Sequence, residues 1–342
     1  MPESYIQPVT DRQSCYKCQK SVTGKQKLSK CSKCHAITYC GRKCQVADWP
    51  RHGWNCVPVM VTEYEGKGRG LVAARDIKMG ELIFMDKPLL KMEAEFRLDT
   101  VLSLAQQIEN LPSEARLLFY KLKGDKYCSN SSKELDIFCS NARAIEGWWI
   151  LFLNAALVNH SCAPNSSLDT VKEEGGTSWC EVKAIKDIVK GEEVTVFYES
   201  GAISLQEYSY QVYGCNAQER KMAIKKNFNF DCKCCVCSGK VPEQEDIIKK
   251  LLHLHGALKL NHSRKEHSDL AESVKIWDQI VDLNLKLYIG SVCDKIWSMQ
   301  DLGEAAQQAG DEILEKKAFD GLKKIAEDYK LNQVIELCKE NP

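Results

Sequence analysis

The sequence lacks a long apolar run. Its longest apolar stretch, Trp148 to Val158, is interrupted by Asn154 and is much shorter than the ~20 residues that a membrane span requires. The amino terminus, Met1 to Tyr5, also lacks a basic segment followed by an apolar core, which is the pattern of a secretory signal peptide. We therefore expect an intracellular protein that contacts no membrane, whose 18 cysteines are reduced and in many cases bound to metal.

The sequence also lacks net charge, because 47 Lys and Arg residues balance 47 Asp and Glu residues. The balance is uneven along the chain. Residues 12–56 contain ten basic residues and one acidic residue, Asp48. A basic patch of this size would attract nucleic acid or an acidic protein surface. Alternatively, the cations offset thiolates that are clustered on metal.

Residues 15–56 are rich in potential zinc ligands, spaced C-x2-C, C-x2-C, C-x3-C and H-x3-C: Cys15, Cys18, Cys31, Cys34, Cys40, Cys44, His52 and Cys56. Zinc takes four such ligands in a tetrahedron, so eight predict two closed structural sites. Because this segment is too small to bury enough apolar surface to fold unaided, we expect it to unfold without metal.

A second set of motifs lies further along the chain. The polar segment Asn159–Asn165 follows the apolar stretch, which predicts a buried element that opens onto a site. Residues 66–70 alternate glycine with cations, and residues 191–198 form a turn and a strand that ends on Tyr198. Residues 232–237 supply three thiols that need a fourth ligand, for which Cys162 is a candidate.

Over residues 64–237, these motifs resemble, in their order, the SET-domain protein lysine methyltransferases. Residues 15–56 resemble a MYND zinc finger, down to Tyr39 and Trp49. Together with a helical C-terminal tail, these motifs make nearly the whole chain similar to the SMYD (SET and MYND domain) family. Here the finger precedes Gly66 instead of interrupting the SET domain, as in the arthropod SmydA-like branch. The resemblance implies an α+β fold: a SET β-fold with a pseudoknot, an N-terminal MYND cross-brace and a C-terminal α-helical, tetratricopeptide-like tail.

We predict four segments on this basis. They are a MYND finger at 15–56, a SET domain at 61–200 with a helical insert at about 96–123, a post-SET zinc flap at 201–240 and a helical domain at 243–342. Apolar residues at helical spacing in the last segment predict stacked antiparallel helices. Its histidines lack metal-site spacing and are expected to pack or to be solvated: His253, His255, His262 and His267.

The resemblance implies three zinc ions. The first would be held by Cys15, Cys18, Cys40 and Cys44, the second by Cys31, Cys34, His52 and Cys56, and the third by Cys162, Cys232, Cys234 and Cys237. Cys235 breaks the spacing and is not expected to bind. The MYND resemblance also implies a groove for proline-rich peptides, lined by Gln45 and Trp49. The alternative for Trp49 is a packed cap on the second zinc site.

The resemblance further implies a cofactor, S-adenosylmethionine, whose expected binding residues are Lys67, Gly68, Arg69, Asn141, Asn159, His160, Tyr198 and Phe230. Tyr198 matches the catalytic tyrosine of the family; the alternative is an ordinary tyrosine at a strand end. We place Asn141 at the end of a strand; the alternative to a cofactor contact is that it is an ordinary turn residue. Phe228 stands where many relatives carry a second tyrosine, so the number of methyl groups added, or the rate, could differ.

We therefore predict a zinc-containing, S-adenosylmethionine-dependent protein-lysine N-methyltransferase, acting as a monomer on a histone or non-histone lysine in the cytoplasm and nucleus. Expected further partners are a proline-rich peptide and nucleic acid at the finger. The alternative is a weak or inactive SET scaffold that serves as a transcriptional corepressor adaptor; Phe228 favours it, whereas Tyr198 favours an enzyme. A RING-like ubiquitin ligase would share the cross-brace but leave the motifs at Gly66, Asn159 and Tyr198 unexplained.

Overall fold

The structure is a computed structural model that describes residues 6, 14–20, 28–53, 56–95, 97–124, 132–145, 147–172, 178–198, 217–263, 269–287 and 292–329. The chain divides into two compact units. Unit 1 comprises Met1–Asn159 and Leu168–Val196, and unit 2 comprises His160–Ser167 and Phe197–Pro342. The four predicted segment boundaries stay predictions, and residues 199–216 of the predicted flap lie outside the described residues.

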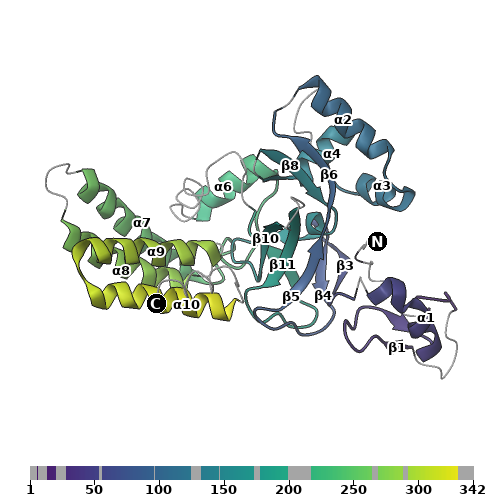
Figure 1. Cartoon of the computed structure of the whole chain (residues 1–342), viewed down its shortest axis with the longest axis horizontal. Helices are drawn as coiled ribbons and strands as arrows, with labels where there is room; N and C mark the ends of the chain where they lie inside the picture. The colour runs from purple at the N-terminus through teal and green to yellow at the C-terminus, as the bar shows by residue number, and fades with distance from the viewer. Residues whose placement is uncertain are drawn as a thin grey trace. The chain divides into compact units, whose positions relative to one another are not determined.

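The amino-terminal part of unit 1 is a small finger. A two-stranded ribbon, β1 (Ser29–Lys30) and β2 (Thr38–Tyr39), precedes helix α1 (Arg42–His52) (Figure 1). The buried Tyr39 hydroxyl donates a 2.9 Å hydrogen bond to the buried Asp48 carboxylate, which fixes the helix to the ribbon. The finger's hydrophobic core consists mainly of cysteines, with Ile37 and Tyr39. So little apolar burial agrees with an element that depends on metal.

Three small sheets follow the finger, and most of their strands belong to unit 1 (Figure 1). Their strand orders are β3-β4-β12-β9, β10-β11-β5 and β6-β8-β7. The bounds are β3 (Val59–Tyr64), β4 (Gly68–Ala73), β5 (Leu82–Asp86), β6 (Pro88–Glu93), β7 (Arg143–Ile145), β8 (Trp148–Phe152), β9 (Asn159–His160, of which Asn159 belongs to unit 1), β10 (Ser166–Lys172, which belongs to unit 1 from Leu168 onward), β11 (Ser178–Ala184) and β12 (Glu193–Val196).

The apolar stretch 148–158 is a buried element, as predicted. Its first part is β8, in which Leu151 and Phe152 are fully buried, and its second part is the short 3₁₀ helix η2 (Ala155–Leu157). The buried Asp86 carboxylate accepts hydrogen bonds from the backbone N–H groups of Asn154 (2.7 Å) and Ala155 (2.9 Å), where η2 begins. This contact fixes the chain shortly before the motif at Asn159.

The finger contacts the sheets of its own unit through Arg75. The Arg75 guanidinium donates to the Lys33 carbonyl at 2.9 Å and to the carboxylate of Glu81 at 2.5 Å. Because Arg75 follows β4 and Lys33 lies between two zinc-ligand cysteines, this contact connects a sheet to the loop of the second predicted zinc site.

The helical insert predicted at about 96–123 contains two helices, α2 (Leu98–Glu109) and α3 (Ser113–Tyr120). A third helix, α4 (Lys133–Asn141), follows beyond the predicted bounds. Our placement of Asn141 at the end of a strand was wrong, because Asn141 is the last residue of α4. The Ser132 hydroxyl caps this helix by accepting from the backbone of Leu135 at 3.2 Å, and Phe138 is buried. A serine followed by acidic residues before an apolar pair is a helix-start signal that was present in the sequence.

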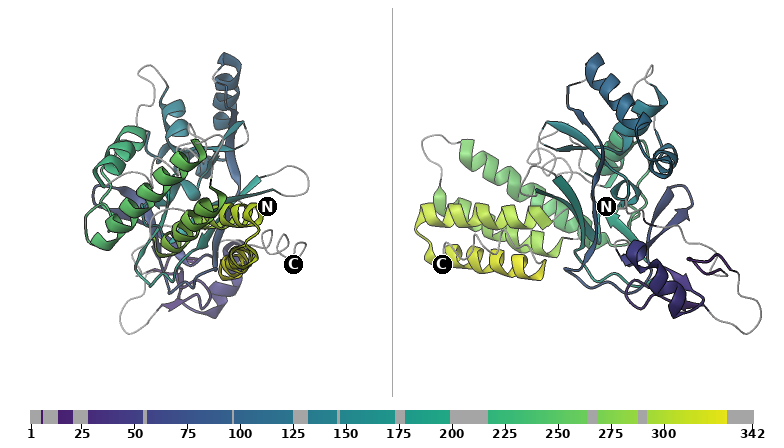
Figure 2. Two further views of the ribbon diagram at one scale, coloured as in Figure 1. Left: turned by 90° about the vertical axis from the view of Figure 1, so that its left-hand side faces the viewer. Right: turned by 45° about the vertical axis from the view of Figure 1, so that its right-hand side comes forward.

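Unit 2 is mainly helical, as predicted for the tail. Its helices are α6 (Ala217–Phe228), α7 (Pro242–Ser263), α8 (Leu270–Lys286), α9 (Val292–Ala309) and α10 (Glu312–Asp328). Consecutive helices from α7 to α10 pack on one another (Figure 2). The helical domain was predicted to extend to residue 342, but residues 330–342 lie outside the described residues. Among the described helices, none has both the length and the apolar character needed to cross a membrane.

Candidate active site and metal centres

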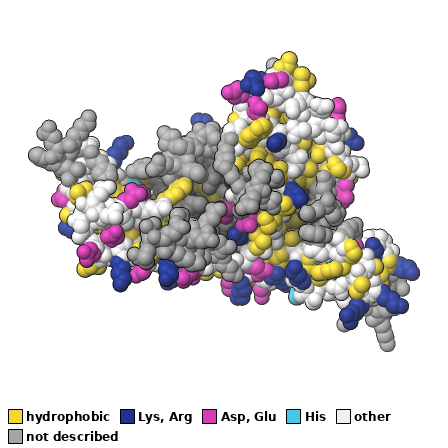
Figure 3. Space-filling model, viewed as in Figure 1, with side chains coloured by type: hydrophobic (Ala, Val, Ile, Leu, Met, Phe, Trp, Pro, Cys, Tyr) yellow, Lys and Arg dark blue, Asp and Glu magenta, His cyan; other side chains and the backbone are white. Residues whose placement is uncertain are grey.

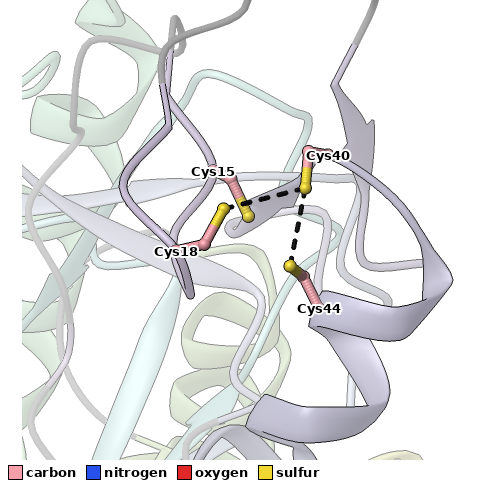
Figure 4. Close-up of side chains that lie close together, drawn as sticks. All are labelled: Cys15, Cys18, Cys40 and Cys44. Atoms are coloured by element: carbon pink, nitrogen blue, oxygen red, sulfur yellow. Dashed lines mark hydrogen bonds between the residues drawn. The ribbon is translucent and has the colours of Figure 1, made fainter.

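The first predicted zinc ligands lie together in the finger: Cys15, Cys18, Cys40 and Cys44, with their sulfur atoms within 4.8 Å of one another. The Cys18 and Cys40 sulfurs are 3.8 Å apart and those of Cys40 and Cys44 are 3.5 Å apart (Figure 4). A tetrahedral zinc with Zn–S bonds of about 2.3 Å places its sulfurs about 3.8 Å apart, so this group fits a zinc ion.

The second predicted set also lies together: Cys31, Cys34, His52 and Cys56. The Cys31 and Cys56 sulfurs are 3.7 Å apart, and the Cys34 sulfur is 3.6 Å from His52 Nε2. All four ligand atoms are buried. These distances and donor types fit a second zinc ion, and the two sets interleave along the chain as the MYND resemblance implied.

Trp49 packs on the second metal group and is still partly exposed. Its ring meets the His52 ring edge-on at a centroid distance of 5.8 Å and lies against the backbone of Gly53. The residue is nevertheless 46% exposed, and the half-buried Gln45 is four residues earlier on the same face of α1. One side of Trp49 thus packs on the second metal group, as the alternative expected. The exposed side is the one on which the peptide groove stays a prediction.

The third predicted set lies in unit 2: Cys162, Cys232, Cys234 and Cys237. The Cys162 sulfur is 3.9 Å from that of Cys232 and 3.5 Å from that of Cys237. Contacts among these sulfurs raise the pKa of Cys162 and lower that of Cys232, because four thiols this close cannot all ionise without a cation. A zinc ion supplies that cation, so the three groups suit three zinc ions. As expected, Cys235 does not join this group.

In unit 1, the glycine-rich residues 66–70 form the turn and first strand residues of the β3–β4 hairpin, with Gly66 and Gly68 at positive φ of 72° and 77°. A Cβ atom on Gly70 would lie 2.5 Å from the Asn159 side-chain nitrogen and 2.9 Å from the Tyr64 ring. Only glycine therefore fits between these two side chains. The hairpin and the start of the motif at Asn159 are in direct contact.

Glu193 connects several of the predicted residues, although the sequence did not single it out. Its Oε1 accepts the Asn159 side-chain amide at 2.9 Å, and its Oε2 accepts the Lys67 ammonium at 2.6 Å. The same Asn159 nitrogen donates to the Arg69 carbonyl at 3.3 Å. Burial, aided by the charge of Glu193, raises the pKa of Tyr64 to about 12. Glu193 stood in the quoted motif at 191–198, but only the pairing of β12 with β4 shows what it contacts.

Arg69 and Asn141 both bind the main chain that follows α3. The Arg69 guanidinium donates to the Lys121 carbonyl at 2.6 Å, and the Asn141 amide donates to the carbonyls of Lys123 (2.8 Å) and Ile137 (2.7 Å). Asn141 thereby holds the end of α4 against this segment. Its structural role is clear, and its contact with a cofactor stays a prediction.

In unit 2, His160 lies at the centre of an aromatic cluster formed by Phe197, Tyr198, Phe228 and Phe230. The His160 ring is 5.3 Å from the rings of Phe197 and Tyr198 and 5.8 Å from that of Phe230, measured between centroids. Tyr198 in turn lies 5.3 Å from Phe228, edge-on. The Tyr198 backbone N–H donates to His160 Nδ1 at 3.0 Å. Tyr198 itself is half-buried. The neighbouring rings and the backbone hydrogen bond to His160 together fix its position.

Comparisons with known proteins agree with this arrangement. The SET domain family model matches residues 68–199, and the MYND finger model matches residues 15–56. N-lysine methyltransferase SMYD2-B of Xenopus laevis is 27% identical over 257 residues, covering 69% of this chain and 54% of that protein. Human N-lysine methyltransferase SMYD2 is 28% identical over 265 residues, covering 72% and 56%.

Human histone-lysine N-methyltransferase SMYD3 is 24% identical over 243 residues, covering 64% of this chain and 51% of that protein. The chain spans about half the length of these relatives. The finger match ends before the SET match begins, which confirms the predicted order of the two modules. The special likeness to an arthropod branch stays a prediction. The metal groups, the order of motifs and these matches together show that the chain contains a MYND finger, matched at residues 15–56, followed by a SET domain, matched at residues 68–199.

Proposed function

We propose that this protein transfers a methyl group from S-adenosylmethionine to the side-chain amine of a lysine in a protein substrate. The observation that carries the proposal is the setting of Tyr198. This tyrosine is held by its backbone and by the aromatic cluster, and the His160 that holds it lies beside a group of four cysteines that suits zinc. The relatives named above as lysine methyltransferases support the same reaction class.

The aromatic cluster supplies the environment that the amine needs. A free lysine has a pKa of about 10.4, so its neutral, nucleophilic form is scarce near neutral pH. Burial against apolar rings disfavours the ammonium and lowers that pKa. Phe197, Phe228 and Phe230 provide such rings, and the Tyr198 hydroxyl is the polar group among the cluster's four aromatic residues that can orient the amine.

S-adenosylmethionine supplies the electrophilic methyl group when bound. We propose that the residues which hold it are those expected from the family resemblance: Lys67, Gly68, Arg69, Asn141, Asn159, His160, Tyr198 and Phe230. In unit 1, the positive φ of Gly68 and the missing Cβ of Gly70 bring backbone close to Asn159, which is the geometry that a loop needs to approach a ligand closely. The ring of Phe230 offers a stacking surface for a base.

The test is Tyr198→Phe, compared with the unchanged protein. We expect methyl transfer to a histone mixture or a lysate of lysine-containing proteins, followed with labelled S-adenosylmethionine, to fall by more than 100-fold. Cofactor affinity, measured by calorimetry, should stay within about threefold, whereas Asn159→Ala should abolish it. Full activity of Tyr198→Phe would refute its catalytic role. If the unchanged, zinc-loaded protein bound no cofactor, the methyltransferase proposal itself would fail.

A second candidate function rests on the exposed face of α1. Trp49 is 46% exposed and Val46 is 62% exposed, with Gln45 beside them. We propose that this face binds a proline-rich peptide, which would suit an adaptor in the cytoplasm and nucleus. Lys and Arg side chains gather on the finger (Figure 3), so nucleic acid is the competing ligand. Peptide binding that is lost in Trp49→Ala with zinc content intact would support the groove; duplex binding that Trp49→Ala leaves unchanged would favour the competitor.

A further inference from the structure

We propose that His160 is a positioning residue that joins the third metal group to the main chain of Tyr198. This role differs from the contact with the cofactor expected for His160 above. The inference rests on the proposed function only where it concerns methyl transfer, because the two hydrogen bonds involved exist whatever the activity is.

The first hydrogen bond determines which nitrogen of His160 carries the proton. A backbone amide can only donate, so the Tyr198 N–H at 3.0 Å requires a lone pair on His160 Nδ1. The neutral imidazole must then carry its proton on Nε2. This assignment follows from the direction of the bond and needs no hydrogen position.

The second hydrogen bond follows from that tautomer. His160 Nε2 is 3.4 Å from the Cys162 sulfur, within the range of an N–H···S contact. Because Nε2 holds the proton, it is the donor, and the Cys162 thiolate of the metal group is the acceptor. Groups that donate to a metal-bound thiolate stabilise its charge and fix its direction. Four thiolates on one Zn²⁺ carry two net negative charges, which makes such a donor favourable.

The surroundings of His160 keep the ring in this orientation. The residue is only 6% exposed, and the rings of Phe197, Tyr198 and Phe230 pack around it. A flipped ring would place carbon atoms opposite both the Tyr198 N–H and the Cys162 sulfur, so both hydrogen bonds would be lost together. The imidazole therefore acts as a rigid spacer between a metal ligand and the residue proposed to be catalytic. Zinc at this group would thus set the position of Tyr198 through His160.

Two substitutions separate the two bonds. In His160→Asn, the side-chain oxygen occupies the place of Nδ1 and can still accept from Tyr198, but nothing reaches Cys162. In His160→Gln, the side-chain nitrogen occupies the place of Nε2 and can still donate to Cys162, but the acceptor for Tyr198 is lost. His255→Asn serves as a matched control, since His255 is a partly buried histidine against Trp277, away from the metal groups.

Zinc release to a chromogenic chelator, and kcat and KM for methyl transfer, are measured on all four proteins. We expect His160→Asn to release its third zinc 10- to 100-fold faster, because the Cys162 thiolate loses its donor. We expect His160→Gln to keep its zinc but lose at least tenfold in kcat at similar KM. His255→Asn should change neither. If the two His160 variants behave alike in both assays, the proposed division of roles is wrong.

Nitrogen-15 NMR of histidine-labelled protein gives a reading that does not depend on activity. The His160 resonances, assigned by their absence in His160→Gln, should show an unprotonated Nδ1 and a protonated Nε2. A protonated Nδ1 would overturn the inference. If this tautomer and the zinc-release pattern were found in a protein that transfers no methyl group, the coupling would stand and the proposed function would fail.

Discussion

Asn159 donates its side-chain amide to Glu193 Oε1 at 2.9 Å, which joins the start of one motif to the strand of another. The other carboxylate oxygen of Glu193 binds Lys67 in the glycine-rich hairpin at 2.6 Å. Glu193 therefore holds two pieces of the candidate cofactor site, Asn159 and the Lys67 hairpin, in register, although it touches no ligand in the proposal. Because Lys67 is 42% exposed and its ion pair is screened by water, the bond to Asn159 is the stronger of the two constraints.

We predict that Glu193→Gln weakens the binding of S-adenosylmethionine about tenfold, equivalent to about 1.4 kcal/mol. The amide that replaces one carboxylate oxygen repels either the Asn159 amide or the Lys67 ammonium, so Asn159 loses its fixed orientation. Calorimetric titration checks the affinity. Lys78→Gln is the control, because the Lys78–Asp187 pair is also in unit 1 but is 77% and 59% exposed. An affinity for Glu193→Gln equal to that of the control would show that Asn159 needs no such anchor.

The metal groups were predictable from the sequence because zinc ligands are specified by residue type and local spacing. Glu193 and the coupling through His160 were not, since each depends on contacts between strands or loops that are far apart in the chain. The failure at Asn141 is of another kind. Its helix α4 begins with a capping serine and buries Phe138, signals that were present, but the short apolar pattern fits a strand equally well.

We predict that the first metal group loses its zinc before the other two. Cys40 is exposed, whereas all ligand atoms of the second group are buried and the third includes the fully buried Cys162.

Stepwise addition of a thiol-alkylating reagent, with zinc release followed by a chromogenic chelator, checks the order. Peptide mass spectrometry after release of the first equivalent should find Cys40 and Cys44 modified and Cys162 intact. The buried Cys180, whose pKa is raised by burial, is an internal control that should stay unmodified throughout. Early modification of Cys162 or Cys232 would contradict the predicted order.

We predict that Ile248→Ala in α7 lowers both stability and methyl transfer. Ile248 is fully buried in a cluster with Val236 of the zinc loop, and Phe197, which precedes Tyr198, packs against this cluster. The buried Arg220 of α6 also pairs with Glu245 of α7. The cavity left by alanine should cost about 2–5 kcal/mol and loosen the support of Phe197.

Leu302→Ala in α9 is the matched control for this prediction. Leu302 is also fully buried but does not belong to the cluster that Phe197 contacts. Urea unfolding should show similar losses for the two variants. At a temperature where both stay folded, only Ile248→Ala should reduce kcat. Equal kcat values would mean that the tail helix stabilises unit 2 without supporting Tyr198.

Asp86 provides a prediction of pH dependence. Its carboxylate is buried, and burial raises its pKa to about 6 despite hydrogen bonds from Ala155 and Asn154. The unfolded value is about 3.9. The native state therefore binds the proton more tightly than the unfolded chain, so this group stabilises the fold fully below about pH 4, and its contribution is lost as the pH rises through about 6.

Asp86→Asn removes this dependence. We expect the free energy of unfolding of the unchanged protein, relative to that of the variant, to fall by about 1 kcal/mol between pH 5 and pH 7. Zinc ligands also take up protons in this range, but they do so in both proteins, so their effect cancels in the difference. Urea unfolding of both proteins at each pH gives the four free energies required. A difference that rises with pH would mean that the hydrogen bonds at the start of η2 outweigh burial, so that the carboxylate is the preferred native form.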